Sequence, residues 1–148
     1  MGEFHANGYN TGNTATIGQV GDDNVAFNNQ NDGRLSTATI VQGGDRNRGY
    51  NLSNGGTSHS SAIGQFGDDN VAFNVRSRGG NESNGNDATV LQLGNGNAAA
   101  NYQDDLVGSE QFTRNSANIG QFGWRNDATN FQDTGSDNDA NIAQFGRD

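Results

Sequence analysis

Residues 63–74 read IGQFGDDNVAFN and residues 17–28 read IGQVGDDNVAFN, so eleven of these twelve positions are identical. Near-identical segments at a distance indicate that one structural unit is built several times along a chain. Alignment on the glutamine finds the pattern Ala-x-Ile/Val-x-Gln-x-Gly six times, with Ser61 replacing the alanine once, at glutamine spacings of 23, 23, 27, 29 and 23 residues. The six glutamines are Gln19, Gln42, Gln65, Gln92, Gln121 and Gln144.

Three further series recur in register with the glutamines. An aliphatic residue stands two positions before each glutamine: Ile17, Ile40, Ile63, Val90, Ile119 and Ile142. In the first five units an asparagine stands five positions after the glutamine: Asn24, Asn47, Asn70, Asn97 and Asn126. A second asparagine follows four residues later: Asn28, Asn51, Asn74, Asn101 and Asn130.

These series divide the chain into a tail and six repeats. The tail, residues 1–12, holds a partial repeat, because Gly8-Tyr9-Asn10 resembles Gly49-Tyr50-Asn51. The six repeats, the last of them truncated, lie at about 13–30, 36–53, 59–76, 86–103, 115–132 and 138–148. We interpret the longer connections, 76–87 and 104–115, as excursions from one corner of a stack, because added loop length costs little free energy.

Within a repeat the pattern has a period of two. From Asn13 to Gln19 every second residue is small, aliphatic or an amide, which is typical of a half-buried strand. A Gly-Asp-Asp-Asn cluster or its equivalent follows, and this is turn chemistry. A second alternating segment then begins at Asn24. Each repeat is therefore predicted to form a strand, an arc and a second strand.

The composition decides how such strands could be buried. Only 30% of the residues are hydrophobic, below the roughly 45–50% of ordinary domains, and proline is absent. Proline cannot donate to a strand ladder, so its absence fits a chain made of interior strands. If the repeats stack parallel and in register, each buried amide can donate to one neighbour and accept from the other. We predict an all-β fold, a parallel β-solenoid whose interior consists of aliphatic, glutamine and asparagine columns.

Composition also excludes several classes of function. The net charge of −9 argues against nucleic acid as a partner, which would require a basic surface. The absence of cysteine removes disulfides and thiol chemistry. No apolar run approaches the ~18 residues of a membrane span, so membrane insertion is not expected. The first ten residues have neither a basic segment nor an apolar segment, and no signal peptide is expected there.

Catalytic, metal and cofactor sites are not expected. His5 and His59 have no nucleophile at a fixed relation to them, so no group of residues meets the requirements of an active site. Asp22-Asp23 and Asp68-Asp69 are similar to calcium-binding β-roll repeats, but those repeats are short and tandem. We interpret the acidic arcs as solvated turns or as charges that repel misregistered neighbours. Thr-x-Thr rows typical of ice-binding faces begin at Thr14 and Thr37 but do not continue.

Aromatic side chains point outward from both strands of the repeats. A monomer seldom exposes such a stripe without using it. We therefore predict a lateral aromatic face that packs one solenoid against another. Its residues are Phe27, Phe66, Phe73, Phe122 and Phe145.

The first repeat resembles the curlin repeat, the building block of curli functional amyloid. The residues that carry the resemblance are Gln19, Gly21, Asn24, Ala26 and Gln30. The same five residue types recur in the fourth repeat as Gln92, Gly94, Asn97, Ala99 and Gln103. In the fifth repeat they recur as Gln121, Gly123, Asn126, Ala128 and Gln132. The second and third repeats depart from the pattern at Gly49, Ser53 and Arg76, and the opening position of the third is His59. We expect His59 and Arg76 to weaken the third repeat.

The resemblance implies a structural subunit that is not an enzyme. Such a subunit is extracellular and bacterial, is secreted unfolded, and assembles into amyloid fibres of the biofilm matrix. The resemblance also implies two partners besides other copies of the chain, a nucleator subunit and an outer-membrane secretion pore. Two alternatives stay open at this point. One is a minor nucleating subunit, and the other is a capped, soluble solenoid that binds ice, calcium or a surface ligand.

Overall fold

A computed structural model describes residues 2–7, 11–31, 33–77, 85–104, 114–133 and 137–146, and these residues contain strands and no helix. The strands are β1 (Gly2–Asn7), β2 (Thr14–Val20), β3 (Val25–Asn31), β4 (Thr37–Gly43), β5 (Arg48–Asn54), β6 (Ser60–Phe66), β7 (Val71–Ser77), β8 (Asp87–Asn95), β9 (Ala98–Asp104), β10 (Ser116–Trp124), β11 (Asp127–Asp133) and β12 (Asp139–Gly146).

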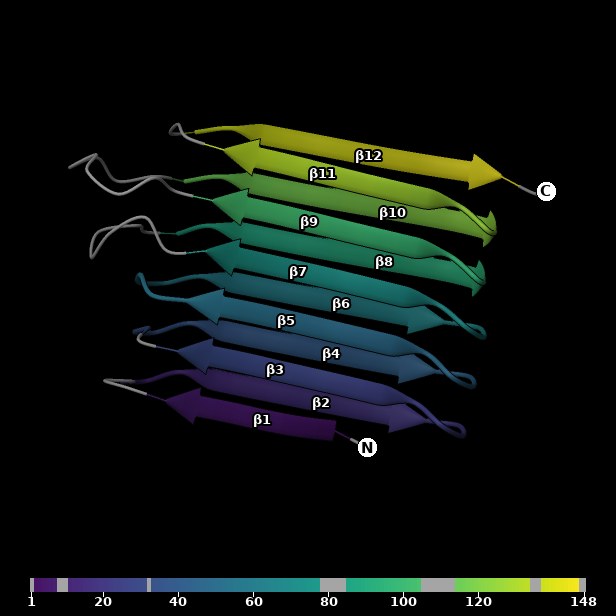
Figure 1. The fold of residues 1–148 in the computed structure, drawn as a ribbon, viewed down its shortest axis with the longest axis horizontal. Helices are drawn as coiled ribbons and strands as arrows, with labels where there is room; N and C mark the ends of the chain where they lie inside the picture. Colours follow the sequence, from purple (N-terminus) through teal and green to yellow (C-terminus); the bar gives the residue numbers. More distant parts are fainter. Residues whose placement is uncertain are drawn as a thin grey trace.

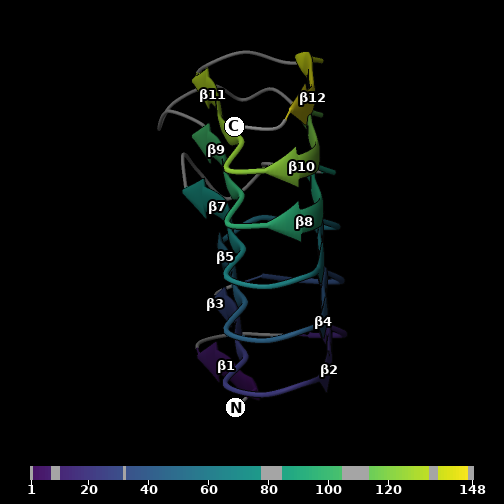
Figure 2. The same ribbon diagram turned by 90° about the vertical axis from the view of Figure 1, so that its right-hand side faces the viewer.

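The strands alternate between two parallel sheets. The odd-numbered strands form one six-stranded sheet in the order β1-β3-β5-β7-β9-β11, which we call the odd sheet. The even-numbered strands form the other in the order β2-β4-β6-β8-β10-β12, which we call the even sheet. The chain climbs from β1 to β12 and crosses from one sheet to the other at every arc (Figures 1 and 2). The predicted parallel β-solenoid is confirmed, with about five turns.

All neighbouring strands are in the register that the repeats predict. In the even sheet Gln19 pairs with Gln42, and Gln65 pairs with Gln92. The register is kept although the glutamine spacing rises from 23 to 27 residues between repeats three and four. The extra residues belong to the connections 76–87 and 104–115, which lie largely outside the described residues. Stacking therefore follows the side-chain pattern of the strands and not the length of the connections.

A strand precedes the first repeat, but not where the sequence pattern suggested. In the structure β1 pairs with β3, with Gly2 opposite Ala26. The half-repeat that precedes repeat one therefore lies at residues 2–7. The segment Gly8-Tyr9-Asn10, which we interpreted as that half-repeat, lies outside the described residues.

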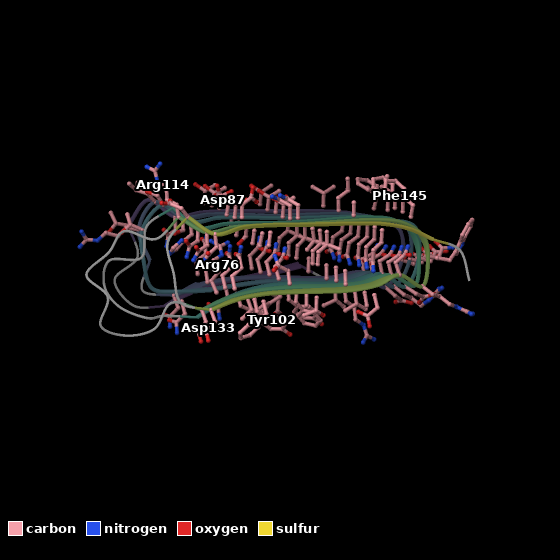
Figure 3. The ribbon with its side chains drawn as sticks, turned by 90° about the horizontal axis from the view of Figure 1, so that it is seen from above. Arg76, Asp87, Tyr102, Arg114, Asp133 and Phe145 are labelled. Carbon is pink, nitrogen blue, oxygen red and sulfur yellow. The ribbon has the colours of Figure 1, made fainter. Side chains whose placement is uncertain are left out.

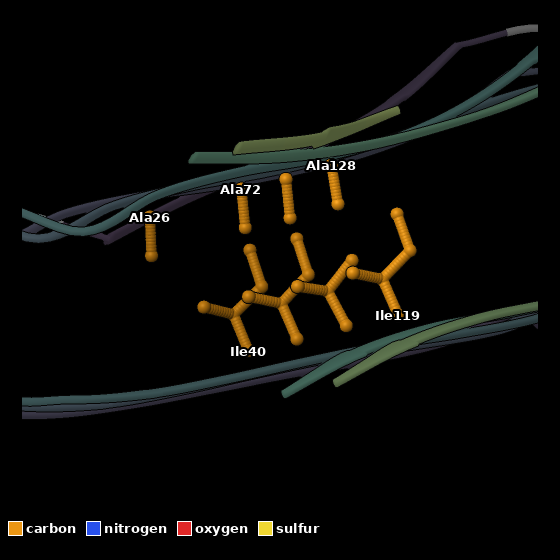
Figure 4. Close-up of a cluster of buried hydrophobic side chains, with 8 residues drawn as sticks. Ala26, Ile40, Ala72, Ile119 and Ala128 are labelled. Atoms are coloured by element: carbon orange, nitrogen blue, oxygen red, sulfur yellow. The ribbon is translucent and has the colours of Figure 1, made fainter. Parts of the chain in front are cut away.

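The core is a thin layer between the two sheets. Burial alternates along each strand, as in β4, where Ala38, Ile40 and Gln42 are buried. Figure 4 shows isoleucines of the even sheet facing alanines of the odd sheet. The buried hydrophobic cluster consists of Ala26, Ile40, Ile63, Ala72, Val90, Ala99, Ile119 and Ala128, with Ile17 and Ile142 partly buried at its two ends. Such a small apolar cluster leaves most of the interior to polar side chains.

Glycine is required where each arc begins. Gly67 has φ 114°, a conformation that side-chain-bearing residues rarely adopt. A Cβ atom built on Gly67 would collide with the backbone carbonyl of Gly94 in the next repeat. The same approach recurs from Gly44 to Gly67 and from Gly94 to Gly123. The glycine column therefore sets how closely successive arcs stack.

We predict that Gly67→Ala destabilises the solenoid by at least about 3 kcal/mol, because the backbone strain adds to a backbone collision that no side-chain rotation relieves. Gly18→Ala is the matched control. A Cβ atom on Gly18 meets nothing within 4 Å, and the equivalent position in β12 is Ala143. Urea unfolding followed by circular dichroism measures both variants. Equal stability of the two variants would contradict the close stacking of the arcs.

Candidate functional site: the amide ladders and the sheet edges

The six glutamines form one continuous hydrogen-bonded ladder. The Nε2 of each glutamine donates to the Oε1 of the next, at 2.8, 2.7, 2.9, 2.9 and 2.8 Å from Gln19 to Gln144. The four central glutamines are at most 1% exposed. The structure thus brings together all the predicted glutamine residues, and the donors of this ladder all point toward the C-terminal end of the stack.

The same glutamines also join the two sheets. Gln65 Nε2 donates its second proton to the carbonyl of Arg48 at 3.1 Å, and Gln92 donates to the carbonyl of Val71 at 3.0 Å. Gln121 reaches the carbonyl of Ala98 in the same way. The five glutamines from Gln42 to Gln144 therefore each bind a strand of the odd sheet that belongs to the preceding repeat. One side chain holds together neighbours along the stack and across it.

The first asparagine series fastens the arcs. The backbone N–H of Asn47 donates to Asn24 Oδ1 at 2.9 Å, and Asn47 Nδ2 donates to the carbonyl of Gly67 at 2.6 Å. The bond from the backbone N–H to the preceding Oδ1 recurs at Asn70, Asn97 and Asn126. These asparagines thus bind backbone as well as side chains, whereas the sequence pattern predicted a plain side-chain ladder.

The second asparagine series forms a ladder of opposite polarity. Nδ2 of Asn51 donates to Oδ1 of Asn28 at 2.9 Å, toward the N-terminal end of the stack. The bonds from Asn74 to Asn51 and from Asn101 to Asn74 follow at 3.1 and 3.0 Å. The ladder stops before Asn130, because Asn101 Oδ1 and Asn130 Nδ2 are buried without a hydrogen-bond partner among the described residues.

Two more columns of polar side chains, at the opening and closing positions of the repeats, take part in the interior bonding. At four of the five joints the opening residue of one repeat accepts the backbone N–H of the opening residue of the next, as Asn13 Oδ1 does from Ser36 at 3.0 Å. The closing residue donates across the sheets, as Gln103 Nε2 does to the carbonyls of Asp87 and Asn115 at 3.0 and 3.1 Å. The recurrence of amides at both positions was visible in the sequence, and this was the signal for these columns.

The prediction that His59 and Arg76 weaken the third repeat stays a prediction. Both side chains bond to the next repeat, but Arg76 Nε is buried without a hydrogen-bond partner among the described residues. His59 Nδ1 accepts the backbone N–H of Asn86 at 3.2 Å. Arg76 donates to the carbonyls of Ser60 and Asn86 at 2.8 and 3.0 Å. Burial lowers the pKa of Arg76 to about 10, and the nearby Asp87 carboxylate partly opposes this effect. Arg76 is therefore a cation at neutral pH inside an otherwise uncharged amide interior.

The predicted lateral aromatic face is divided between two opposite surfaces. Phe27 and Phe73 lie on the odd sheet, whereas Phe66, Phe122 and Phe145 lie on the even sheet. Figure 3 shows Phe145 and Tyr102 on opposite outer faces of the stack. The chain reverses direction at each arc, so outward residues of the two strands of one repeat cannot share a face.

Rings stack along the axis on both faces. Phe122 and Phe145 have ring centroids 4.9 Å apart and nearly parallel planes on the even sheet. Tyr50 and Phe73 stack at the same distance on the odd sheet. Phe145 is 77% exposed, so the row on the even sheet ends in an open ring.

The acidic arcs bind backbone amides of neighbouring arcs. Asp45 Oδ1 accepts the backbone N–H of Asp22 at 2.8 Å, and Asp68 Oδ1 accepts that of Asp45 at 2.9 Å. Arg46 and Asp69 form an exposed ion pair, with Nε and Oδ1 2.7 Å apart. Their hydrogen bond raises the pKa of Arg46 and lowers that of Asp69. Within the described ranges, no three His, Cys, Asp or Glu side chains are grouped to hold a metal ion.

Sequence comparison agrees with this geometry. Residues 113–146 match the family of the curlin associated repeat. The match contains β10, β11 and β12, and therefore both the last bond of the glutamine ladder, from Gln121 to Gln144, and one end of the stack. No curated protein and no solved structure matches the chain. Among the described residues, the structure contains no helix of the length and apolar character that a membrane span requires.

We predict that Gln65→Ala destabilises the solenoid by about 2–4 kcal/mol, because it leaves the Gln42 donor and the Gln92 acceptor buried without partners. Ser61→Ala, on the same strand and also inward-facing, is the matched control. Ser61 Oγ is buried and has no hydrogen-bond partner among the described residues, and the equivalent residue in every other repeat is alanine. We expect this variant to unfold within about 1 kcal/mol of the wild-type protein. Equal destabilisation in urea would show that the ladder does not stabilise the interior.

Proposed function

We propose that this protein is a structural subunit that assembles end to end into extracellular, curli-like amyloid fibres. The observation that carries the proposal is that the two ends of the stack are edges with matching side-chain columns. At one end the edge strands are β1 and β2, and at the other they are β11 and β12. Unpaired edges of this kind are templates for pairing with another chain.

The match is clearest between β12 of one copy and β2 of the next. In the register of the even sheet, Ile142 would lie on Ile17 and Gln144 on Gln19 of the second copy. Gln144 accepts from Gln121 and donates one proton to the carbonyl of Asp127. Its second Nε2 proton then has the geometry to reach the Gln19 oxygen of the next copy, which would continue the ladder through the joint.

The odd sheet would continue at the same joint. Because β1 pairs with β3 with Gly2 opposite Ala26, β1 of a second copy has the register to pair with β11, with Gly2 opposite Ala128. We propose that the six repeats from residue 13 onward form one assembly unit, and that the segment before them completes the last repeat of the neighbouring copy. The partners in this proposal are other copies of the chain. A nucleator subunit and an outer-membrane pore remain proposals that rest on the family resemblance.

Lateral contacts are a further part of the proposal. Both outer faces carry aromatic rows, and end-to-end assembly would extend each row along the whole fibre. We propose that these rows pack one solenoid against another, as required for fibres of more than one filament in biofilm, adhesion and aggregation. Packing by two faces would also allow filaments to form wider bundles than packing by one.

The direct test is fibre diffraction on protein that is purified unfolded and then left in buffer without denaturant. The proposal predicts a meridional reflection near about 4.7–4.8 Å and an equatorial reflection near about 10 Å. A folded protein that stays monomeric at high concentration would contradict it and favour the capped, soluble solenoid. If the purified protein by itself forms fibres slowly but accelerates another fibre-forming protein at a low molar ratio, the minor nucleating subunit would instead be favoured.

We predict that Gln144→Glu slows fibre elongation at neutral pH by about tenfold or more. The carboxylate can still accept from Gln121, but it would face the Gln19 oxygen of the incoming copy with no proton to donate, which costs about 1–3 kcal/mol. Asn141→Asp is the matched control, because it adds the same charge to the exposed outer side of the same strand. Seeded thioflavin T kinetics compare the two variants. Equal slowing by both would point to net charge and not to the ladder.

A further inference from the structure

His59 and Arg76 meet at one residue, Asn86. This residue is where the described chain re-enters the stack, after a connection of which residues 78–84 lie outside the described ranges. Its backbone N–H donates to His59 Nδ1, and its carbonyl accepts from Arg76 Nη1 and from the backbone N–H of Ser60. His59, Arg76 and Asn86 are each at most 4% exposed. The third repeat therefore holds the start of the fourth through His59, which immediately precedes β6, and Arg76 on β7.

The first, fourth and fifth repeats make the bond of His59 with an amide oxygen, which does not titrate near neutral pH. Asn86 Oδ1 accepts the backbone N–H of Asn115 at 2.9 Å, and Asn115 Oδ1 accepts that of Asn138 at 3.2 Å. An amide oxygen accepts a hydrogen bond at any moderate pH. An imidazole nitrogen accepts one only while it carries no proton. The joint between the third and fourth repeats is therefore the one joint of this column, among the described residues, that depends on an unprotonated base.

We propose that His59 is a pH-sensitive latch, and that its protonation releases Asn86 and opens the stack between the third and fourth repeats.

The surrounding charges reinforce the latch. Arg76 reaches Asn86 from β7. Among the buried side chains of the described residues, Arg76 and His59 are the two that can carry a positive charge, and none is a carboxylate. Asp87 on β8 and Arg34 and Arg114 in the connections are exposed, and Asp104 at the end of β9 is half-exposed. A protonated His59 would therefore place a second positive charge in the region that already holds the Arg76 cation. Screening by solvent is weak there, because both side chains are buried.

The direction of the effect follows from proton binding. An imidazole in an unfolded chain binds a proton near pH 6.5, whereas the closed latch requires an unprotonated Nδ1. The open form therefore binds more protons, so the closed form loses stability as the pH falls below about 6.5. The opening equilibrium constant should rise by up to about tenfold for each further pH unit. If the proposed function holds, mild acid would also slow assembly, because an opened stack presents no continuous edge.

Hydrogen exchange of the full chain in its monomeric form tests the latch, independently of whether fibres grow. Exchange is measured by mass spectrometry between pH 7.5 and 5.0 and corrected for the intrinsic pH dependence of amide exchange. For the wild-type protein we expect opening of residues 59–66 and 86–95 to rise by at least about tenfold at pH 5.0 relative to residues 17–28. The variant His59→Asn introduces the residue type found at this position in four of the other five repeats and should show no such rise.

Two further variants keep the test decisive. His5→Asn removes the other histidine and should retain the full acid response. If His59→Asn does not fold, His59→Ser replaces it, because Ser36 occupies the same position in the second repeat. An equal acid response with and without His59, or no acid response in the wild-type protein, would overturn the proposal. Failure to form fibres with an intact acid response would instead remove the proposed function and leave the latch in place.

Discussion

A buried side-chain amide must satisfy two donors and an acceptor, and this requirement determines most of the structure. Gln65 meets it by accepting from Gln42 and donating both to Gln92 and to the carbonyl of Arg48. Only a stack of parallel, in-register strands supplies all three partners to every glutamine. A slip by one residue would turn the amides outward and leave their backbone partners buried without bonds. The amides therefore specify the register, which a small apolar core could specify only weakly.

The two kinds of ladder run in opposite directions. Glutamines donate toward the C-terminal end, whereas the second asparagine series donates toward the N-terminal end. The dipoles of the two ladders thus oppose each other inside the same interior. The ends of the stack also become chemically different, with a glutamine oxygen at β2 and a glutamine N–H group at β12. Two copies match when the C-terminal end of one meets the N-terminal end of the other, whereas two C-terminal ends would bring donor against donor.

The sequence was sufficient to predict the inward-facing columns of the repeats. It was insufficient to predict the features that depend on how the chain turns between strands. The columns of Gln19 and Ile17 followed from spacing alone, because a period of two fixes which residues face inward. The prediction of one aromatic face was wrong because it assigned Phe27 and Phe66 to the same surface. It did not allow for the reversal of the chain between the two strands of a repeat. The left-handed conformation of Leu35 and Ser58 at the opposite corner had no signal in residue type, since both carry side chains.

The third repeat shows how side chains that depart from the pattern can still bond within the stack. Arg76 and His59 depart from the residues that recur elsewhere, so they were expected to be defects. The structure places the Arg76 guanidinium where its two donors replace those of a glutamine, and the His59 ring where its nitrogen replaces an amide oxygen. Equivalent hydrogen-bond geometry, and not residue identity, is what the stack requires. What differs is the charge that each of the two side chains can carry.

Hydrogen exchange of the side-chain amide protons, observed by nuclear magnetic resonance, tests the ladder most directly. Side-chain amides in water exchange fast, whereas protons that are buried and hydrogen-bonded exchange only when the structure opens. We predict that the Nε2 protons of Gln42, Gln65, Gln92 and Gln121 exchange as slowly as the backbone amides of the strands around them. The Nδ2 protons of Asn141, on the exposed outer face, should exchange fast. Fast exchange at Gln65 and Gln92 in an otherwise protected stack would show that the interior is not held together by an amide ladder.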